Sequence, residues 1–288
     1  MTRCFPTWNL ARFKESHSVS SSDNRNQLIR AATETCYLDH LQLKFDWADD
    51  VVDLIAWKSL SIALRRIHRE CLCTKICNDL LPTASVQYHQ KQQGHDTCSL
   101  CGKEETTEHM ILCTHPSRLK LRRRYIKSIR TRLKHVHTKP GLIDAFCSAI
   151  TDWYDYGVID PASYHPQYQE AIIQQSDIGW NHVCMGHIST AWSTIQFPPG
   201  QSPDNAQTRN MWTSSIVEVS LRWIIDFLWE TRNKDVHGHT ETEQNDRLRV
   251  KHQATFCGML AQKPHMRPSD HWLFPDNPEQ FLATATAN

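Results

Sequence analysis

A short segment rich in cysteine and histidine carries the clearest chemistry in this sequence. Residues 98–113 read CSLCGKEETTEHMILC, so Cys98, Cys101, His109 and Cys113 form a C-x2-C-x7-H-x3-C pattern. A tight turn between the first two cysteines can direct two thiolates at one ion, and Gly102 can adopt the positive φ that such turns need. His109 and Cys113 are one turn apart on a helix and share a face.

Thiolate and imidazole are ligands that Zn²⁺ prefers, and four of them leave no open coordination position. The pattern therefore predicts a structural Zn²⁺ cofactor that stabilises a segment poor in large apolar residues. His115 is an alternative fourth ligand, and His95 is a weaker one. The nearby CLCTKIC segment, residues 71–77, lacks a second ligand pair, so we expect its three cysteines (Cys71, Cys73 and Cys77) to pack within a helix.

A basic run follows the cysteine motif. From Arg118 to Lys134 the sequence contains many Lys and Arg residues and no acid. Such clustering can hold a phosphate backbone without regard to base sequence. We expect five residues of this run to contact phosphates of RNA or DNA: Arg122, Arg123, Arg124, Lys127 and Arg130. The alternative is the solvated face of an amphipathic helix. We expect Tyr125, within the run, to be a core residue.

Composition limits the number of domains, the location and the membrane topology that the chain can have. The 288 residues are 40% hydrophobic and 22% charged with a net charge of +1, so one large or two modest globular domains can form. The polar start shows no signal-peptide pattern and predicts a reducing, intracellular location, in the nucleus or cytoplasm. Eleven cysteines is a high number for such a protein, and in a reducing compartment clustered cysteines are expected to be metal ligands or buried residues and not disulfides. The longest apolar run, Leu221–Trp229, is interrupted by Arg222 and Asp226 and is too short to cross a membrane.

Strand signals are scarce, so the predicted fold class is mainly α: a zinc-binding helical module followed by a helical bundle. The predicted boundaries are a flexible tail (1–27), the zinc module (28–138), the helical C-terminal domain (139–262) and a second tail (263–288). Apolar periodicity predicts helices over 28–41, about 49–67, 117–133, 142–153, 179–196 and 211–235, and another from about 241. The tryptophans of the 211–235 helix, Trp212, Trp223 and Trp229, are expected in the core, and His237-Gly238-His239 fits a helix C-terminus.

Further motifs surround the zinc ligands. A helix ends in LPT (Leu81, Pro82, Thr83), and a spacer leads to Cys98, Cys101 and Gly102, then Glu105, Thr106, Glu108, His109 and Cys113, then His115, Pro116, Ser117 and Arg118. This arrangement resembles the zinc-binding segment downstream of the polymerase in non-LTR retrotransposon reverse transcriptases. Farther on, IGW (Ile178–Trp180) and WETRNKDVHG (Trp229–Gly238) resemble segments in the C-terminal parts of such proteins. The resemblance covers about residues 50–240 and implies a retroelement polymerase as a possible partner.

The polymerase signature of that family is missing. Asp49 and Asp50 are similar to the paired aspartates of a polymerase metal site, but only 48 residues precede them. We interpret them as acidic residues at a helix start, where the helix dipole favours them. No Gly-rich phosphate loop or nucleophile elbow is present. The chain is therefore predicted to have no catalytic residues and no small-molecule substrate.

The sequence thus predicts a non-catalytic, zinc-binding and nucleic-acid-binding accessory segment derived from a retroelement reverse transcriptase. The alternative hypothesis is a zinc-stabilised helical protein-interaction module that does not bind nucleic acid. A third is a decaying fragment of an element without a cellular function.

Overall fold

The computed structural model describes residues 36–199 and 205–285, and most of them are helical. The predicted mainly α class is confirmed: over these ranges there is no extended strand, only isolated bridges between Ile55 and Ser189 and between Thr97 and Glu104. The predicted tail at 1–27 lies outside the described residues. In the same ranges, no helix combines the length and the apolar character needed to cross a membrane.

The chain divides into two units, residues 1–53 and 54–288. In the first unit, residues 36–45 are helical, and Asp49 and Asp50 lie in the turn immediately before α2 (Val51–Leu54), as the helix-start interpretation predicts. The second unit contains α3 (Trp57–Arg66), α4 (Glu70–Cys77), α5 (Ala84–His89), α6 (Thr107–Leu112), α7 (Pro116–His135), α8 (Pro140–Tyr156), η1 (Pro161–Ser163), α9 (Pro166–Ile178), α10 (Asn181–Met185), α11 (Thr190–Gln196), α12 (Asn205–Arg222), η2 (Trp223–Trp229), α13 (Glu230–His237), α14 (Glu241–Gln262), η3 (Lys263–His265), η4 (Pro268–Leu273) and α15 (Pro278–Ala285).

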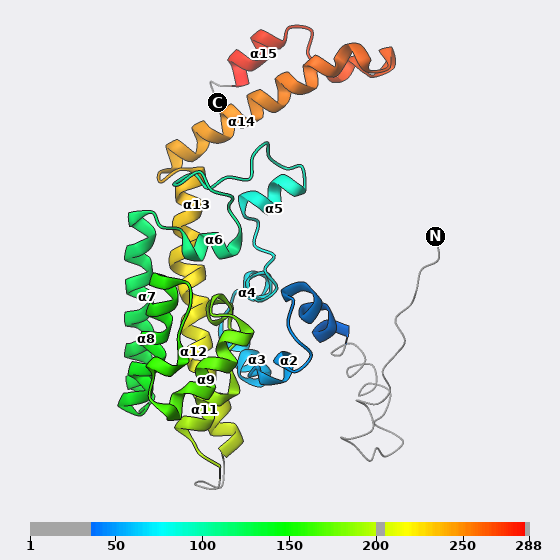
Figure 1. The fold of residues 1–288 in the computed structure, drawn as a ribbon. Coiled ribbons are helices and arrows are strands. Elements are labelled where there is room, and N and C mark those ends of the chain that lie inside the picture. The colour runs from blue at the N-terminus through cyan, green and yellow to red at the C-terminus, as the bar shows by residue number, and fades with distance from the viewer. Residues whose placement is uncertain (1–35, 200–204, 286–288) are drawn as a thin grey trace, which may run out of the picture. The chain divides into compact units, whose positions relative to one another are not determined.

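Helix α12 is the centre of the second unit (Figure 1). It packs against α3 and α7, and also against α10 and α11, while α7 lies along α8. One continuous core contains buried side chains from Leu60 in α3 to Leu228 in η2. The predicted domain boundary between residues 138 and 139 lies inside this core, because α7 and α8 on either side of it both contribute buried residues.

The chain is helical without interruption from α12 through η2 to α13, and η2 is a π-helix. Sequence periodicity predicts a helix here but not the wider turn. Trp223 stacks on Tyr125 of α7 with ring centroids 4.4 Å apart, and its indole N–H donates to the carbonyl of Leu121 at 3.0 Å. Trp212 and Trp223 are buried and Trp229 is partly buried against the core, which agrees with the expectation for all three.

Several helix ends follow from local sequence. Pro116, Pro140 and Pro166 occupy the first turns of α7, α8 and α9, where a missing N–H costs nothing. No predicted helix covers α9, although Pro166 in its first turn is the kind of residue that begins a helix. The predicted helix over 179–196 divides into α10 and α11 because Gly186 has a φ of +94° and turns the chain between them.

Candidate metal centre

The zinc motif begins with a narrow hairpin. Thr97 and Glu104 pair across it, the N–H of Cys98 donates to the carbonyl of Lys103 at 2.7 Å, and the N–H of Gly102 donates to the carbonyl of Cys98 at 2.9 Å. Gly102 has a φ of +74°, the left-handed conformation that the sequence predicts for it. This turn places the thiols of Cys98 and Cys101 on the same side.

The other two ligands come from α6. Thr106 is its N-cap and accepts from the backbone N–H of His109 at 3.0 Å. The helix ends at Leu112, so Cys113 is its C-cap and not a helical residue. A helix of six residues is unstable alone. It needs the packing of Met110 and Ile111, which are buried, and a link to the hairpin.

The four donor atoms converge. The sulfur of Cys101 lies 3.2 Å from Nε2 of His109 and 3.9 Å from the sulfur of Cys113. All four ligand atoms, including that of Cys98, lie within 4.8 Å of one another. Tetrahedral zinc with ordinary bond lengths requires sulfur–sulfur separations of about 3.8 Å and sulfur–nitrogen separations of about 3.5 Å. The side chains are therefore positioned to hold a metal ion, and the donor set is compatible with zinc.

Burial differs across the cluster and affects its protonation. Cys113 is 1% exposed, and burial raises the pKa of its thiol to about 11. Burial also raises the pKa of the Cys101 thiol, but hydrogen bonds from the backbone of Lys103 and from neighbouring thiols outweigh it and lower that pKa. Burial lowers the pKa of His109. A metal that binds here must displace the proton of Cys113, so its affinity depends on pH.

The alternative ligands do not join the cluster. His115 is the N-cap of α7, and its Nδ1 lies 2.8 Å from the hydroxyl of Ser117. His95 lies 3.5 Å from the hydroxyl of Thr97. Among the three cysteines of α4, Cys73 and Cys77 are buried as expected, and burial raises the pKa of Cys77 to about 12. Cys71 is exposed instead, because it lies on the outer face of α4.

Arg122 differs from its predicted role as a phosphate contact. Its side chain is 7% exposed, its Nε donates to the carbonyl of Ile111 at 3.0 Å, and its Nη2 donates to the carbonyl of Cys113 at 2.9 Å. The guanidinium also lies over the ring of Tyr154, 4.9 Å from the centroid. Arg122 therefore binds the C-terminal carbonyls of α6 and holds the zinc segment against α7, so in this fold it cannot face a phosphate.

Two ion pairs, one buried and one partly buried, join this region to α13, and sequence reasoning missed both. Arg118 donates to Asp235 at 2.7 Å, and Arg232 forms a two-pronged pair with Glu105, at 2.5 Å and 3.2 Å. Both arginine side chains are nearly inaccessible, at 3% and 5% exposed. All four residues fall inside the motifs used for the resemblance or directly beside them. The sequence does show charges of opposite sign in the cysteine motif and in WETRNKDVHG, and this was the one signal that could have indicated the two ion pairs.

The remaining basic residues of α7 are more accessible. Arg123, Arg124 and Lys127 are exposed, and Arg124 lies 4.1 Å from the ring centroid of Phe227. Arg130 is partly neutralised, because it forms a salt bridge with Asp144 at 2.5 Å. Lys120 and Lys134 are also exposed. The structure therefore brings the four predicted metal ligands together and separates the five predicted phosphate contacts into buried, paired and exposed residues.

Comparisons of the chain with protein-family models, with curated proteins and with solved structures gave no match. The geometry establishes a mainly helical protein with a three-cysteine, one-histidine cluster positioned to hold a metal ion.

Proposed function

We propose that the chain is a zinc-stabilised accessory module that binds RNA or DNA through α7 and has no catalytic role of its own. In this proposal Cys98, Cys101, His109 and Cys113 hold structural Zn²⁺. The module belongs to the C-terminal part of a retroelement reverse transcriptase and acts beside its polymerase. The exposed basic face of α7 is the observation that carries the proposal.

That face, here called the basic face, consists of Lys120, Arg123, Arg124, Lys127 and Lys134. At 100° per residue, these five positions fall within an arc of about 100° on the helix. They extend over about 21 Å along its axis, enough to follow several phosphates of one strand. Side-chain atoms of Arg124, Lys127 and Arg132 also line a shallow hollow on this helix.

The basic face is held in a fixed orientation. The opposite side of α7 contributes Tyr125, Ile129 and Leu133 to the core, each at most 1% exposed. Arg118 and Arg122, on the same buried side, attach α7 to α13 and to the zinc segment. A metal ion that stabilises α6 therefore also stabilises the start of α7. Because the cations of the basic face are already oriented before binding, they contact a polyanion at a lower entropic cost.

The retroelement origin is supported by how the quoted motifs meet. Glu105 belongs to the zinc motif and Arg232 to the WETRNKDVHG segment, and their side chains form a buried pair. Gly238, at the end of that segment, has a φ of +116° and ends α13. The two motifs behave as parts of one folded unit, as a shared origin requires.

A salt titration tests the nucleic-acid proposal. The zinc-loaded protein is titrated with a fluorescent single-stranded RNA and with a duplex DNA between 50 and 300 mM KCl. The logarithm of the association constant should fall linearly with the logarithm of the salt concentration. For a single strand, the magnitude of this slope, here called the salt slope, should be about 0.7 per neutralised phosphate. The Arg123→Gln/Lys127→Gln variant should bind more weakly and show a slope smaller by about 1.4.

The matched control is Lys58→Gln/Lys75→Gln, which removes the same charge from exposed positions on α3 and α4. It should retain the affinity and slope of the parent. Equal losses in both variants, or affinity that does not depend on salt, would reject α7 as the nucleic-acid surface.

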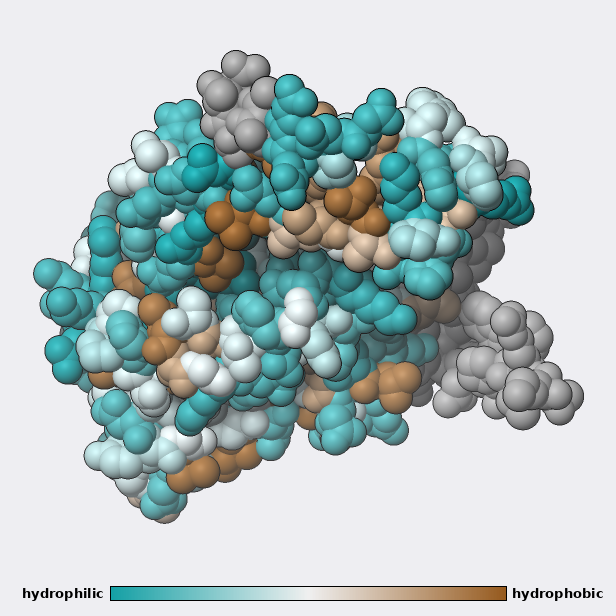
Figure 2. Space-filling view, turned by 90° about the horizontal axis from the view of Figure 1, so that it is seen from above, coloured by the Kyte–Doolittle hydropathy of each residue, from teal (hydrophilic) through white to brown (hydrophobic). Residues whose placement is uncertain are grey.

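The second candidate function is a zinc-stabilised protein-interaction module, and the C-terminal helices favour it. Helix α14 has no buried residue, and α14 and η4 expose large apolar side chains: Leu248, Val250, Met259, Trp272 and Leu273. Figure 2 shows hydrophobic patches on an otherwise mainly hydrophilic face. A parent protein that binds neither nucleic acid in the titration leaves this candidate as the better function.

A further inference from the structure

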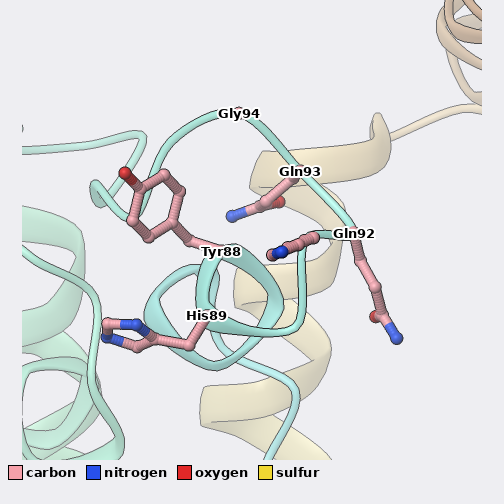
Figure 3. A pocket seen from close by; sticks show the side chains of 6 residues that line it. Tyr88, His89, Gln92, Gln93 and Gly94 are labelled. Carbon is pink, nitrogen blue, oxygen red and sulfur yellow. The ribbon is translucent and has the colours of Figure 1, made fainter.

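A surface hollow lies where α5 leads into the zinc hairpin, and neither the metal nor the basic face accounts for it. It has a volume of about 600 Å³ and is lined by Tyr88, His89, Lys91, Gln92, Gln93 and Gly94. Figure 3 shows the ring of Tyr88 beside the loop, with the amide of Gln93 directed toward it and Gln92 pointing away. The lining contains an aromatic face, amides and a cation, and no acidic residue.

The backbone around the hollow is well fixed. The N–H of Gln92 donates to the carbonyl of Gln87 at 2.8 Å and the N–H of Lys91 to that of Tyr88 at 2.9 Å, the two bonds of a Schellman motif. The amide of Gln93 donates to the carbonyls of Ala84 and His95. These bonds use the Gln93 amide N–H groups and fix its side chain between α5 and the loop.

The hollow is also attached to the zinc hairpin. The N–H of Ser85 in α5 donates to the carbonyl of Glu105, and the Ser85 hydroxyl donates to the carboxylate of Glu104 at 2.6 Å. The hairpin and α5 therefore hold each other, and the exposed groups of the hollow sit on a rigid support. Tyr88 nevertheless remains 44% exposed, so its ring can still receive a ligand.

We infer that this hollow binds an unpaired nucleotide of a single strand, with the base stacked on Tyr88 and the adjoining phosphate contacted by Lys91. The ligand chemistry follows from the lining. A flat aromatic surface suits every base, because each base has a π-face. A single cation without neighbouring acids suits one phosphate. The inference rests on the proposed nucleic-acid function and adds a preference for single strands, which the basic face of α7 does not supply.

The test compares a labelled single-stranded RNA with a duplex of the same sequence, using the zinc-loaded full chain. Tyr88→Ala should weaken single-strand binding by at least about fivefold and leave duplex binding unchanged. Tyr88→Phe keeps the ring and should retain the parent affinity. Both substitutions are at an exposed position, so neither should change the fold.

Lys91→Gly is a second variant that preserves the fold. Lys91 has a φ of +57°, a conformation that glycine adopts more readily, so this substitution should not destabilise the loop. It should lower single-strand affinity and reduce the salt slope by about 0.7. A base with its phosphate can come from a nucleic-acid strand or from a free nucleotide, and competition with millimolar AMP separates the two. A hollow that binds a strand keeps its RNA. Displacement of the RNA by AMP would show a site for free nucleotides and overturn the inference.

Failure of this inference differs from failure of the proposed function. If Tyr88→Ala and Lys91→Gly bind the single strand like the parent while Arg123→Gln/Lys127→Gln does not, the hollow carries no nucleotide and the basic face still binds. If the parent protein binds no oligonucleotide at all, both are wrong.

Discussion

Glu105 and Arg232 form a buried ion pair across 127 positions of sequence. The carboxylate belongs to the zinc hairpin and the guanidinium to α13, and they are 3% and 5% exposed. Both carboxylate oxygens accept a bond from the guanidinium, a geometry that arginine provides and lysine does not. The guanidinium also lies 5.0 Å from the ring centroid of Trp229. This pair fixes the segment that carries the four predicted metal ligands to α13.

Removing one partner of this pair should be costly. Arg232→Met leaves Glu105 buried and unpaired, and we expect the free energy of unfolding to fall by about 3–5 kcal/mol. Urea denaturation followed by circular dichroism measures the change.

The double variant Glu105→Leu/Arg232→Met is the control for that experiment. It removes both charges, so we expect it to recover a large part of the loss, because well-packed apolar residues can replace a buried pair. If the loss in the double variant equals the sum of the losses in Glu105→Leu and Arg232→Met measured alone, the two side chains are not energetically coupled.

Metal removal should unfold the hairpin and α6. We expect about one zinc per chain by elemental analysis of the purified protein, and a lower Tm after treatment with a chelator. Cys98→Ser removes one predicted ligand and should lose the zinc, while Cys71→Ser changes an exposed cysteine outside the cluster and should keep it. Absence of stoichiometric zinc in the parent protein would rule out the zinc site.

The same substitution at two neighbouring arginines of α7 should affect different properties: stability at Arg122 and nucleic-acid binding at Arg123. Arg122→Gln leaves the carbonyls of Ile111 and Cys113 without their charged donor, and we expect a loss of about 2–3 kcal/mol of stability. Arg123→Gln changes an exposed side chain, so stability should stay within about 0.5 kcal/mol and the salt slope for a single strand should fall by about 0.7.

The two measurements are urea denaturation and the salt titration, made on both variants. A loss of salt slope in Arg122→Gln without a loss of stability would mean that this side chain reaches solvent and that its buried position is incorrect.

The contrast between these arginines shows how far the sequence could lead. Short-range patterns predicted the zinc ligands, the cap at Gly238 and the helices α7, α8 and α14, because ligand spacing and apolar periodicity are local properties. Charge alone could not separate Arg122 from Arg123. Which face of a basic helix is buried depends on contacts with α6 and α13, and those partners are distant in sequence.

The missed elements have similar causes. The π-helix at Trp223–Trp229 begins at a residue that is held by tertiary contacts, because Trp223 stacks on Tyr125 and donates to Leu121. The break between α10 and α11 needs Gly186, whose added Cβ would lie 3.0 Å from Leu60 and 3.1 Å from Val217. A single sequence shows the glycine but not the neighbours that require it.

A buried histidine pair should make stability depend on pH. The Nδ1 atoms of His182 and His187 lie 3.0 Å apart, so one ring donates and the other accepts. Burial lowers the pKa of His182 to about 4 and that of His187 well below its usual value. In the unfolded chain each titrates near 6.5. Between about pH 6.5 and 4 the unfolded state therefore binds more protons, and stability falls as the pH falls.

For His182 alone, the loss amounts to about 3 kcal/mol between pH 7 and pH 4. His182→Gln cannot titrate and should show a flatter dependence than the parent in urea denaturation at each pH. His89→Gln, at an exposed position on α5, is the control and should follow the parent. Since zinc release affects all three proteins alike, a His182→Gln curve parallel to the parent would exclude the histidine pair as a source of the acid sensitivity.

The junction between α13 and α14 should tolerate only glycine at position 238. Gly238 has a φ of +116°, which L residues rarely adopt, and a Cβ there would lie 2.8 Å from Cβ of Glu243 and 3.0 Å from the backbone nitrogen of Gln244. Glu243 cannot move away freely, because its carboxylate accepts from the N–H of His239 at 2.7 Å. We expect Gly238→Ala to lower the free energy of unfolding by about 2–3 kcal/mol.

Gly258→Ala is the matched control, since a Cβ at this position of α14 meets no atom within 4 Å. The same substitution should here stabilise the helix by about 0.5–1 kcal/mol, because alanine loses less backbone entropy than glycine. Urea denaturation measures both variants, and limited proteolysis should show faster cleavage near residue 238 in Gly238→Ala alone. Equal stability of the two variants would mean that the positive φ at Gly238 is not required to join α13 to α14.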